Sequence, residues 1–202
     1  MDTIIMSASK LISKKAIRCL GIAESFSKKF DRSILAGVVM RRDFLVDGIA
    51  LTTIKLGGLD ATQGVLEIYR GLKRNDINFI LINGAVISLY NVIDLPYVHE
   101  ETGKPLICIT YNPSKGLEDL LIKLPEGTKR VEIYRKNGPR RKVYLSTGYP
   151  VYLRCFGLSI TDAVKLLNSY TIYGRIPEPV KIANMIARAV LRGLYTDDEK
   201  HV

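Results

Sequence analysis

Three acidic residues and one amide lie where the pattern of the sequence changes, and such positions can carry chemistry. Glu24 follows a short apolar run, Asp60 opens a segment with helical spacing, and Asp94 lies soon after the buried run that ends at Asn83. Carboxylates gathered at one edge of a sheet would bind Mg²⁺ or Mn²⁺, and the metal would activate water for phosphodiester hydrolysis. Each residue also has a simpler interpretation, as a helix cap (Asp60), a turn residue (Asp94) or a solvated loop charge (Glu24).

Basic residues are the second group that could carry function. The net charge is +10 and the pI is about 9.5, which favours a polyanionic partner such as nucleic acid because phosphate neutralisation releases counterions. Half of the residues from 129 to 142 are Lys or Arg. The alternatives are a generally basic surface and a solvated basic turn. The candidate phosphate contacts are Lys55, Arg130, Arg135, Lys136, Arg140, Arg141 and Lys142.

Several other kinds of site are excluded or weakly supported. No Walker loop, G-x-G-x-x-G, H-E-x-x-H or G-x-S-x-G motif occurs. With two histidines, one of them the penultimate residue, a triad mechanism would depend on His99. The three cysteines form no C-x-x-C pair, which is typical of a reducing cytoplasm. The absence of an 18-residue apolar run and of a secretory signal predicts a soluble, cytoplasmic protein without a membrane partner.

The elements that must position these residues begin with three strands. Residues 18–23, 33–40 and 44–54 are apolar or alternating, and their short connections predict an antiparallel meander. Residues 60–72 have apolar side chains at helical spacing, and the continuous apolar run 77–82 is typical of a strand buried on both faces. Later segments alternate between strand and helix. The sequence therefore predicts one α/β domain over residues 1–202, with flexible ends at 1–17 and 195–202.

The second half of the chain contains a predicted basic hairpin and two helices. Asn137-Gly138 is a strong hairpin signal, so residues 130–134 and 142–145 are expected to pair around a basic tip. Residues 151–155 form a strand that leads to a helix capped at Ser159 or Thr161. The last helix is expected to begin near Pro177 or Pro179 and to end at Gly193. Its predicted buried stripe consists of Ile182, Met185, Ile186 and Val190.

Five segments carry a resemblance to a known family. They are "RCLGIAESF", "GLDAT", "LINGAVISLYNVIDL", "TGKPLICIT" and "GRIPEPVKIANMIA". Together they resemble successive motifs of the archaeal endonuclease dU family, which is related to endonuclease V, and the similarity runs from Arg18 to Arg192. The resemblance implies an RNase H-like fold, metal-dependent cleavage of deoxyuridine-containing DNA, and a role in repairing deaminated cytosine.

The chain departs from the family pattern in two motifs, and two of the expected carboxylates are missing. The first-strand motif Gly-Ile-Asp-Asp corresponds to residues 21–24, where Ala23 and Glu24 replace the aspartates, and the Asp-Gly motif corresponds to Asn83-Gly84. The family's Asp-Ala-Thr and Asn-Val-x-Asp motifs are present and contain Asp60 and Asp94. Two hypotheses follow. Either Glu24, Asp60 and Asp94 hold Mg²⁺ with Asn83 as a neutral auxiliary ligand, or the protein binds nucleic acid without a working metal site.

Overall fold

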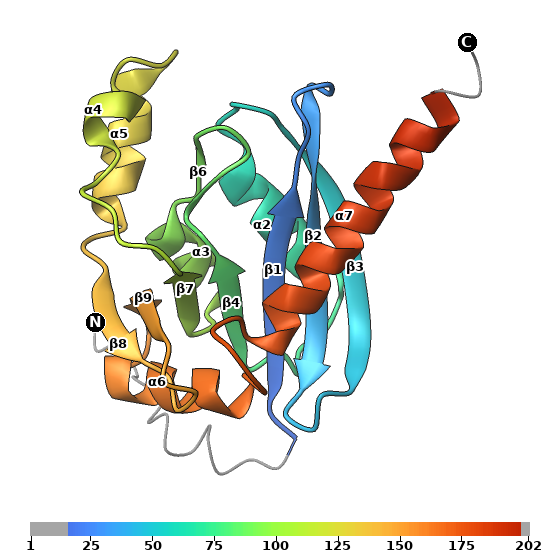
Figure 1. The fold of residues 1–202 in the computed structure, drawn as a ribbon, viewed down its shortest axis with the longest axis vertical. Coiled ribbons are helices and arrows are strands. Elements are labelled where there is room, and N and C mark those ends of the chain that lie inside the picture. The colour runs from blue at the N-terminus through green and yellow to red at the C-terminus, as the bar shows by residue number, and fades with distance from the viewer. Residues whose placement is uncertain (1–15, 199–202) are drawn as a thin grey trace.

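A computed structural model describes residues 16–198, which form a seven-stranded mixed sheet in the order β3-β2-β1-β4-β7-β9-β8 (Figure 1). Strands β1, β4 and β7 are parallel, and the other neighbouring pairs are antiparallel. We call the edge at which β1, β4 and β7 end the carboxyl edge. The strands are β1 (Arg18–Ser25), β2 (Arg32–Arg41), β3 (Val46–Lys55), β4 (Phe79–Asn83), β7 (Leu106–Thr110), β8 (Arg141–Tyr144) and β9 (Pro150–Phe156), and β5 (Val86–Ile87) pairs with β6 (Asn91–Val92).

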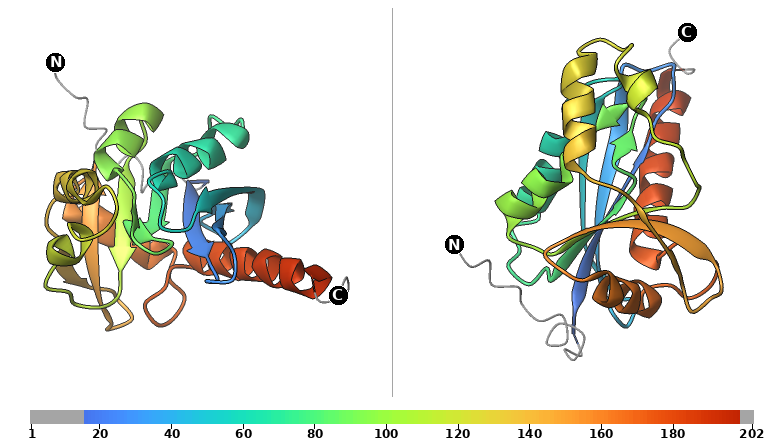
Figure 2. Two further views of the ribbon diagram at one scale, coloured as in Figure 1. Left: turned by 90° about the horizontal axis from the view of Figure 1, so that it is seen from above. Right: turned by 90° about the vertical axis from the view of Figure 1, so that its left-hand side faces the viewer.

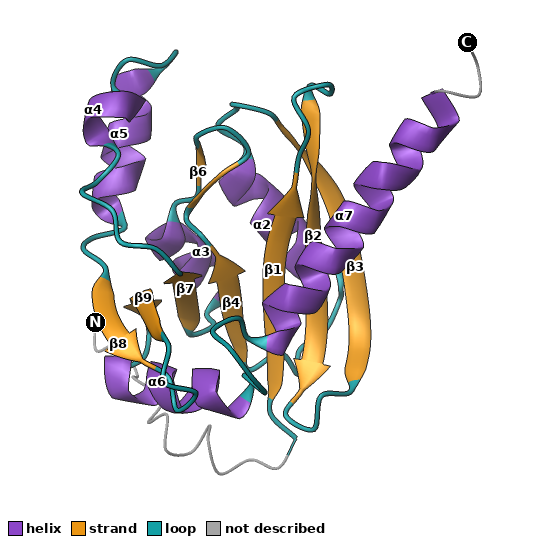
Figure 3. Ribbon diagram, in the orientation of Figure 1, coloured by secondary structure: helices purple, strands orange, loops and turns teal. Residues whose placement is uncertain are grey.

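The helices cover both faces of the sheet and extend past its carboxyl edge. Figure 2 shows α2 (Ala61–Gly71) and α3 (Leu95–Thr102) on one face, and α6 (Ile160–Ser169) and α7 (Glu178–Asp198) on the other. The short helix α4 (Glu118–Leu121) and helix α5 (Gly127–Lys136) lie beyond the carboxyl edge (Figure 3). No helix in the described part of the chain is long and apolar enough to cross a bilayer.

Strand β4 explains why the core has two layers. Ile80 and Ile82 pack in the cluster that includes α2 and α3, whereas Phe79 and Leu81 pack in the cluster that includes α6. Successive strand residues point to opposite faces, so a continuous apolar run is buried on both sides. The run ends at Asn83, which is only partly buried. Asn83, the last residue of β4, therefore lies at the carboxyl edge.

The predicted mixed α/β architecture is confirmed. The meander forms as β1, β2 and β3, the helix after Asp60 forms as α2, and the run from 77 contains the central strand β4. Ser159 is the N-cap of α6, because its side chain accepts a hydrogen bond from the Asp162 amide at 3.1 Å. The segment after Asn91 contains the end of β6 and the start of α3.

The predicted pairing of residues 130–134 with 142–145 is wrong. Residues 127–136 form α5, and Asn137-Gly138 ends this helix instead of closing a hairpin. Gly138 has a φ of 67° and donates its amide to the Arg135 carbonyl at 3.0 Å, which is a helix-ending geometry that glycine adopts easily. Strand β8 pairs with β9. The basic segment is therefore divided between a helix and an edge strand.

The predicted end and buried stripe of the last helix are also corrected. Helix α7 has Pro179 in its first turn but continues through Gly193 to Asp198. Met185 is 62% exposed, and α7 buries smaller residues, among them Ala183 and Ala187. The predicted flexible ends fall largely outside residues 16–198, although Ile17 is buried and its carbonyl accepts the Tyr170 hydroxyl at 2.8 Å.

Candidate functional site

Glu24 and Asn83 lie together at the ends of two adjacent parallel strands. Ile22 of β1 is opposite Ile82 of β4, so the following residues of both strands emerge at the carboxyl edge. Both residues line a cavity of about 270 Å³. Asn184 and Arg188 of α7 line the same cavity, so it is polar and contains a positive charge.

Hydrogen bonds fix the Glu24 carboxylate. Ser88 donates its amide to one oxygen at 3.3 Å and its hydroxyl to the other at 3.2 Å. The Ser88 hydroxyl also lies 2.6 Å from that of Ser33. Burial raises the pKa of the Glu24 carboxyl above its ordinary value, although both hydrogen bonds from Ser88 act in the opposite direction. Glu24 is thus a partly buried carboxylate whose two oxygens already have donors.

Ala23 occupies the other side of β1. It is 2% exposed and packs in a cluster with Ala183 and Ala187 of α7. Strand β1 continues to Ser25, so residues 23 and 24 alternate between faces of the sheet. Glu24 therefore does not place its carboxylate where an aspartate at position 23 would place one.

Asp60 supports the connection between β3 and α2. It occupies the N-cap position of α2, but its side chain does not cap the helix. The carboxylate accepts hydrogen bonds from the Lys55 amide at 2.9 Å and from Asn91 Nδ2 at 2.7 Å. Asn91 also accepts the Ala61 amide at 3.0 Å. These hydrogen bonds give Asp60 a structural role in the connection between β3 and α2.

Asp94 caps α3. One of its carboxylate oxygens accepts the Tyr97 amide at 3.1 Å, and the other lies 3.3 Å from Lys136 Nζ. Its own amide donates to Thr62 Oγ1 at 2.9 Å. Both oxygens therefore have partners within the protein. The expectation that Asp94 would serve as a turn residue is close to what the structure shows.

The donor set does not fit a divalent metal ion. Over residues 16–198, no group of three or more His, Cys, Asp and Glu side chains is placed to hold one. The cavity that contains Glu24 offers an amide at Asn83 instead of a second carboxylate, and Arg188 adds a positive charge that opposes a cation. Magnesium requires oxygen ligands, several of them charged or water. Glu24, Asp60 and Asp94 are consequently not assembled into one ligand set.

Arg130 has a structural role, which weighs against the prediction that it contacts DNA phosphates. The residue is 3% exposed. Its guanidinium donates to the carbonyls of Pro125 at 2.8 Å and Tyr90 at 2.6 Å, and also to those of Gly57 and Gly58. A buried arginine with four carbonyl partners holds α5 against the loops that follow β3 and β5.

The other basic residues predicted to contact phosphates are accessible. They differ in whether a carboxylate of the protein already pairs with their charge. Arg135 is paired with Glu118 at 2.6 Å, and Lys136 with Asp94. Arg141 and Lys142 are exposed on the edge strand β8. Lys55 is exposed at the end of β3, on the same edge as Glu24. The free positive charge is therefore greater along β8 than on α5.

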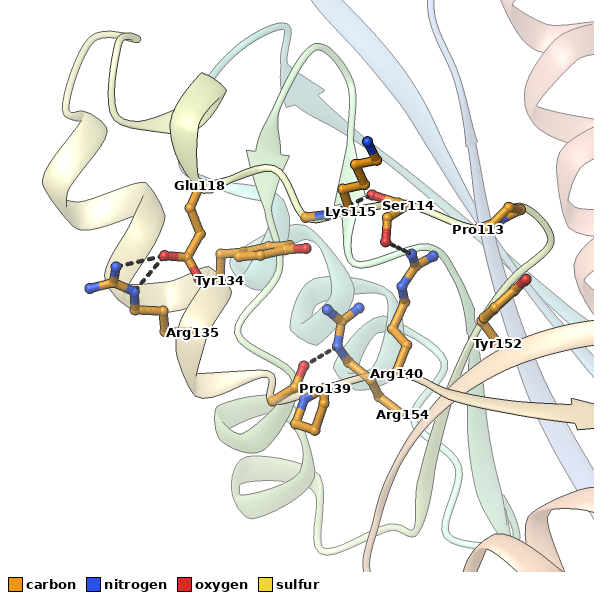
Figure 4. A pocket seen from close by; sticks show the side chains of 12 residues that line it. Pro113, Ser114, Lys115, Glu118, Tyr134, Arg135, Pro139, Arg140, Tyr152 and Arg154 are labelled. Atoms are coloured by element: carbon orange, nitrogen blue, oxygen red, sulfur yellow. Dashed lines mark hydrogen bonds and ion pairs between the residues drawn. The ribbon is translucent and has the colours of Figure 1, made fainter.

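A second cavity lies between α5, β9 and the loop after β7, and one residue of its lining, Arg154, was not among the residues predicted from the sequence. This cavity, which we call the basic cleft, has a volume of about 550 Å³, and its lining includes Lys115, Tyr134, Arg140, Tyr152 and Arg154 (Figure 4). A cavity of about 310 Å³ lies next to it and reaches Asn83 and Gly84. The signal for Arg154 was a charged residue inside the apolar strand segment "VYLRCF".

Comparison of the sequence with known families identifies one match. The profile of a family described as endonuclease dU matches residues 15–191. A UPF0215 protein of Pyrobaculum aerophilum is 34% identical over 179 residues, which are 88% of this chain and 96% of that protein. A UPF0215 protein of Methanopyrus kandleri is 32% identical over 190 residues, 92% of this chain and 96% of the relative.

Solved structures show the same fold. A protein of unknown function from Archaeoglobus fulgidus superposes with a TM-score of 0.77 at 28% identity, covering 87% of this chain and 98% of its own. Ciona intestinalis endonuclease V, in complex with inosine-containing DNA, gives 0.64 at 18% identity, covering 96% of this chain and 93% of that one. The second likeness concerns the fold alone. The predicted RNase H-like mixed sheet is confirmed.

Proposed function

Because the chain belongs to the endonuclease dU family, we propose that it binds nucleic acid along its carboxyl edge with metal-dependent cleavage absent or strongly reduced. One observation carries this proposal. At the ends of β1 and β4, where the resemblance implies aspartates, the chain has Ala23 and Asn83, and Glu24 is the one carboxylate in the cavity that Asn83 lines. A chain with a net charge of +10 and no metal ligand set assembled within residues 16–198 supports binding more than hydrolysis.

The proposed substrate is DNA that contains deoxyuridine, as the family resemblance implies, and the proposed role is in the repair of deaminated cytosine. The excess of positive charge supports a polyanionic partner but supplies no sequence preference. A deaminated base forms a mismatched pair, so less free energy is needed to extrude it from the duplex. Recognition of the lesion would therefore depend on this lower extrusion cost, in addition to phosphate contacts.

A second candidate function is magnesium-dependent endonuclease activity on the same DNA. It is favoured by the retention of Glu24 beside Asn83, whose amide oxygen can still accept from water or contact a cation. In this alternative, Asp60 and Asp94 would have to leave their present partners to join Glu24. Their hydrogen bonds with Lys55, Asn91 and Tyr97 weigh against that rearrangement.

The test measures DNA binding and metal binding separately on the full chain. Fluorescence anisotropy in EDTA should show binding to uracil-containing DNA, and millimolar Mg²⁺ should leave the melting temperature unchanged, because a ligand stabilises a protein only by binding its folded state. The variant carrying Ala23→Asp and Asn83→Asp is the matched control, in which Mg²⁺ should raise the melting temperature. A rise of similar size in the unmodified protein would favour the second candidate, and absence of DNA binding would refute the proposal.

A further inference from the structure

Arg154 is a buried cation with no anionic partner in the basic cleft. It is 7% exposed. Its Nε donates to the Gly138 carbonyl at 2.7 Å, and its guanidinium lies 5.5 Å from the centre of the Tyr134 ring. No carboxylate among the described side chains lies within ion-pair distance of it. Figure 4 shows the two terminal nitrogens of the guanidinium on the side opposite to the dashed line that marks its hydrogen bond.

A second guanidinium enters the same cleft. Arg140 donates to Thr110 Oγ1 and the Asn112 carbonyl, both at 3.0 Å, and to the Ser114 carbonyl at 3.2 Å. It lies 5.2 Å from the centre of the Tyr152 ring. These contacts hold the loop after β7 in place and fix the guanidinium within the cleft. Arg140 also has no carboxylate partner among the residues that the structure describes.

The charge balance of the cleft is therefore strongly positive. Lys115 adds a third basic side chain, and the acidic residue in the lining, Glu118, is already paired with Arg135 at 2.6 Å. Arg154 is buried, Arg140 is partly buried and Lys115 is exposed. Bringing the like charges of the two guanidinium groups together is unfavourable unless an anion compensates them. Guanidinium groups match phosphate geometry especially well because they present several N–H donors in one plane. The cleft is thus built for an anion with several acceptor oxygens.

We propose that the basic cleft binds the phosphate of a nucleotide, with Arg154 as the principal phosphate ligand and Arg140 and Lys115 as supporting charges. A volume of about 550 Å³ lies in the range of roughly 300–1,000 Å³ found for small-ligand sites, so it has room for a nucleoside beside the phosphate. The inference deepens the proposed function, and rests on it for the source of the nucleotide, a nucleic-acid strand. The chemistry of the cleft applies equally to a free mononucleotide.

The cleft extends the nucleic-acid surface beyond Glu24 and Asn83. The neighbouring cavity is lined by Asn83 and Gly84 as well as by Tyr134, Arg140 and Arg154. A strand whose phosphate is held by Arg154 would consequently lie close to the ends of β4 and β7. This placement gives Arg154 a positioning role for the strand, separate from any chemistry at Glu24.

The experiment uses calorimetric titration of the full chain with deoxyuridine monophosphate, deoxyuridine, inorganic phosphate and a single-stranded hexanucleotide. The three phosphate-bearing probes should bind the unmodified protein, and deoxyuridine should not. Arg154→Gln should weaken their binding by about tenfold or more, since it removes charge-assisted hydrogen bonds. Arg70→Gln is the matched control, because it removes the same charge from α2, where Arg70 pairs with Glu101.

A hexanucleotide that binds much more tightly than the mononucleotide would identify a strand as the source of the phosphate, and equal affinities would identify a free nucleotide. Equal losses in Arg154→Gln and Arg70→Gln, or binding of deoxyuridine as tight as that of its monophosphate, would overturn the inference. Failure of all three phosphate-bearing probes to bind the unmodified protein would also overturn it.

A measurement on the unmodified protein covers the case in which Arg154→Gln does not fold. Phosphate should shift the side-chain Nε–H resonance of Arg154 in an NMR titration and leave that of Arg70 in place, and an unmoved Arg154 resonance would overturn the inference. These measurements distinguish a failure of the inference from a failure of the proposed function. Mononucleotide binding without DNA binding contradicts only the proposed function, and DNA binding that is indifferent to Arg154 contradicts only the role of the cleft.

Discussion

At the scale of single residues, Asn83 is the most informative position at the carboxyl edge. It has the shape of aspartate and lines the same cavity as Glu24, but it contributes no charge. Ala23 lies one step past the paired residues Ile22 and Ile82 and is packed against α7. The strands that present these two positions are intact, so a metal site here depends on the side chains alone.

Changing Asn83 to Asp should create a weak magnesium site. The substitution replaces an amide nitrogen with an oxygen at nearly constant volume, so folding should be little affected. Adding Ala23→Asp should enlarge the effect more than additively, because ligands that share one ion are coupled. The measurement is the magnesium-dependent shift in melting temperature, with cleavage of uracil-containing DNA as a second readout. Flat responses in both variants would show that this edge is not a metal position.

Asp60 and Asp94 should respond differently to conversion to asparagine. Asp60→Asn replaces one acceptor with an NH₂ group that faces the Lys55 amide or Asn91, so it should destabilise the fold by about 1 to 3 kcal/mol. Asp94→Asn keeps the cap on α3 and loses an ion pair with the largely exposed Lys136, so it should cost less than about 1 kcal/mol. Urea denaturation measures both. A larger loss for Asp94→Asn would contradict these structural roles.

At the scale of elements, α5 is held in place by one buried arginine. The Arg130 guanidinium joins the helix to the loops that contain Gly57 and Tyr90. Arg130→Met should destabilise the fold by at least about 3 kcal/mol, because several buried carbonyls lose their donors. Arg135→Gln is a control on the same helix, and should leave the denaturation midpoint nearly unchanged because Arg135 is exposed. Similar midpoints for the two variants would refute the structural role of Arg130.

The elements also show which parts of the structure could be predicted from the sequence. The meander, α2 and β4 were predictable because hydrophobic periodicity and burial coincide in them. The segment 130–134 was not, since Asn137-Gly138 can end a helix as readily as it can form a hairpin turn. The choice was decided by tertiary contacts, because Asn137 accepts the Leu95 amide and donates to the Ile93 carbonyl, both at 2.8 Å.

The candidate site was predicted less well for a related reason. Sequence position indicated that Glu24, Asp60 and Asp94 could converge on one edge of the sheet. It did not indicate which side-chain oxygens would already be satisfied by Ser88, Lys55 or Asn91. Arg154 was missed because its significance lies in the absence of a nearby carboxylate, and that is a property of the folded chain.

At the scale of the whole molecule, the distribution of charge predicts the salt dependence of DNA binding. Arg141 and Lys142 are exposed on β8, at the opposite edge of the sheet from β3. Changing both to Gln should reduce the slope of log affinity against log salt by about 1 to 2, because each phosphate contact contributes about 0.9. A control that changes Arg70 and Lys73 of the α2 region to Gln should not reduce it. Equal slopes for the two double variants would show that β8 does not contact DNA.

The central claim is that this member of the endonuclease dU family binds DNA and lacks effective metal-dependent cleavage. The most direct test incubates the full chain with matched uracil-containing, inosine-containing and normal oligonucleotides in the presence of Mg²⁺, Mn²⁺ or EDTA, and measures bound and cleaved DNA in the same samples. We predict binding under all three conditions, and no more cleavage with either metal than with EDTA. Cleavage of the uracil strand that requires a metal, and that is abolished by Glu24→Gln, would contradict the claim.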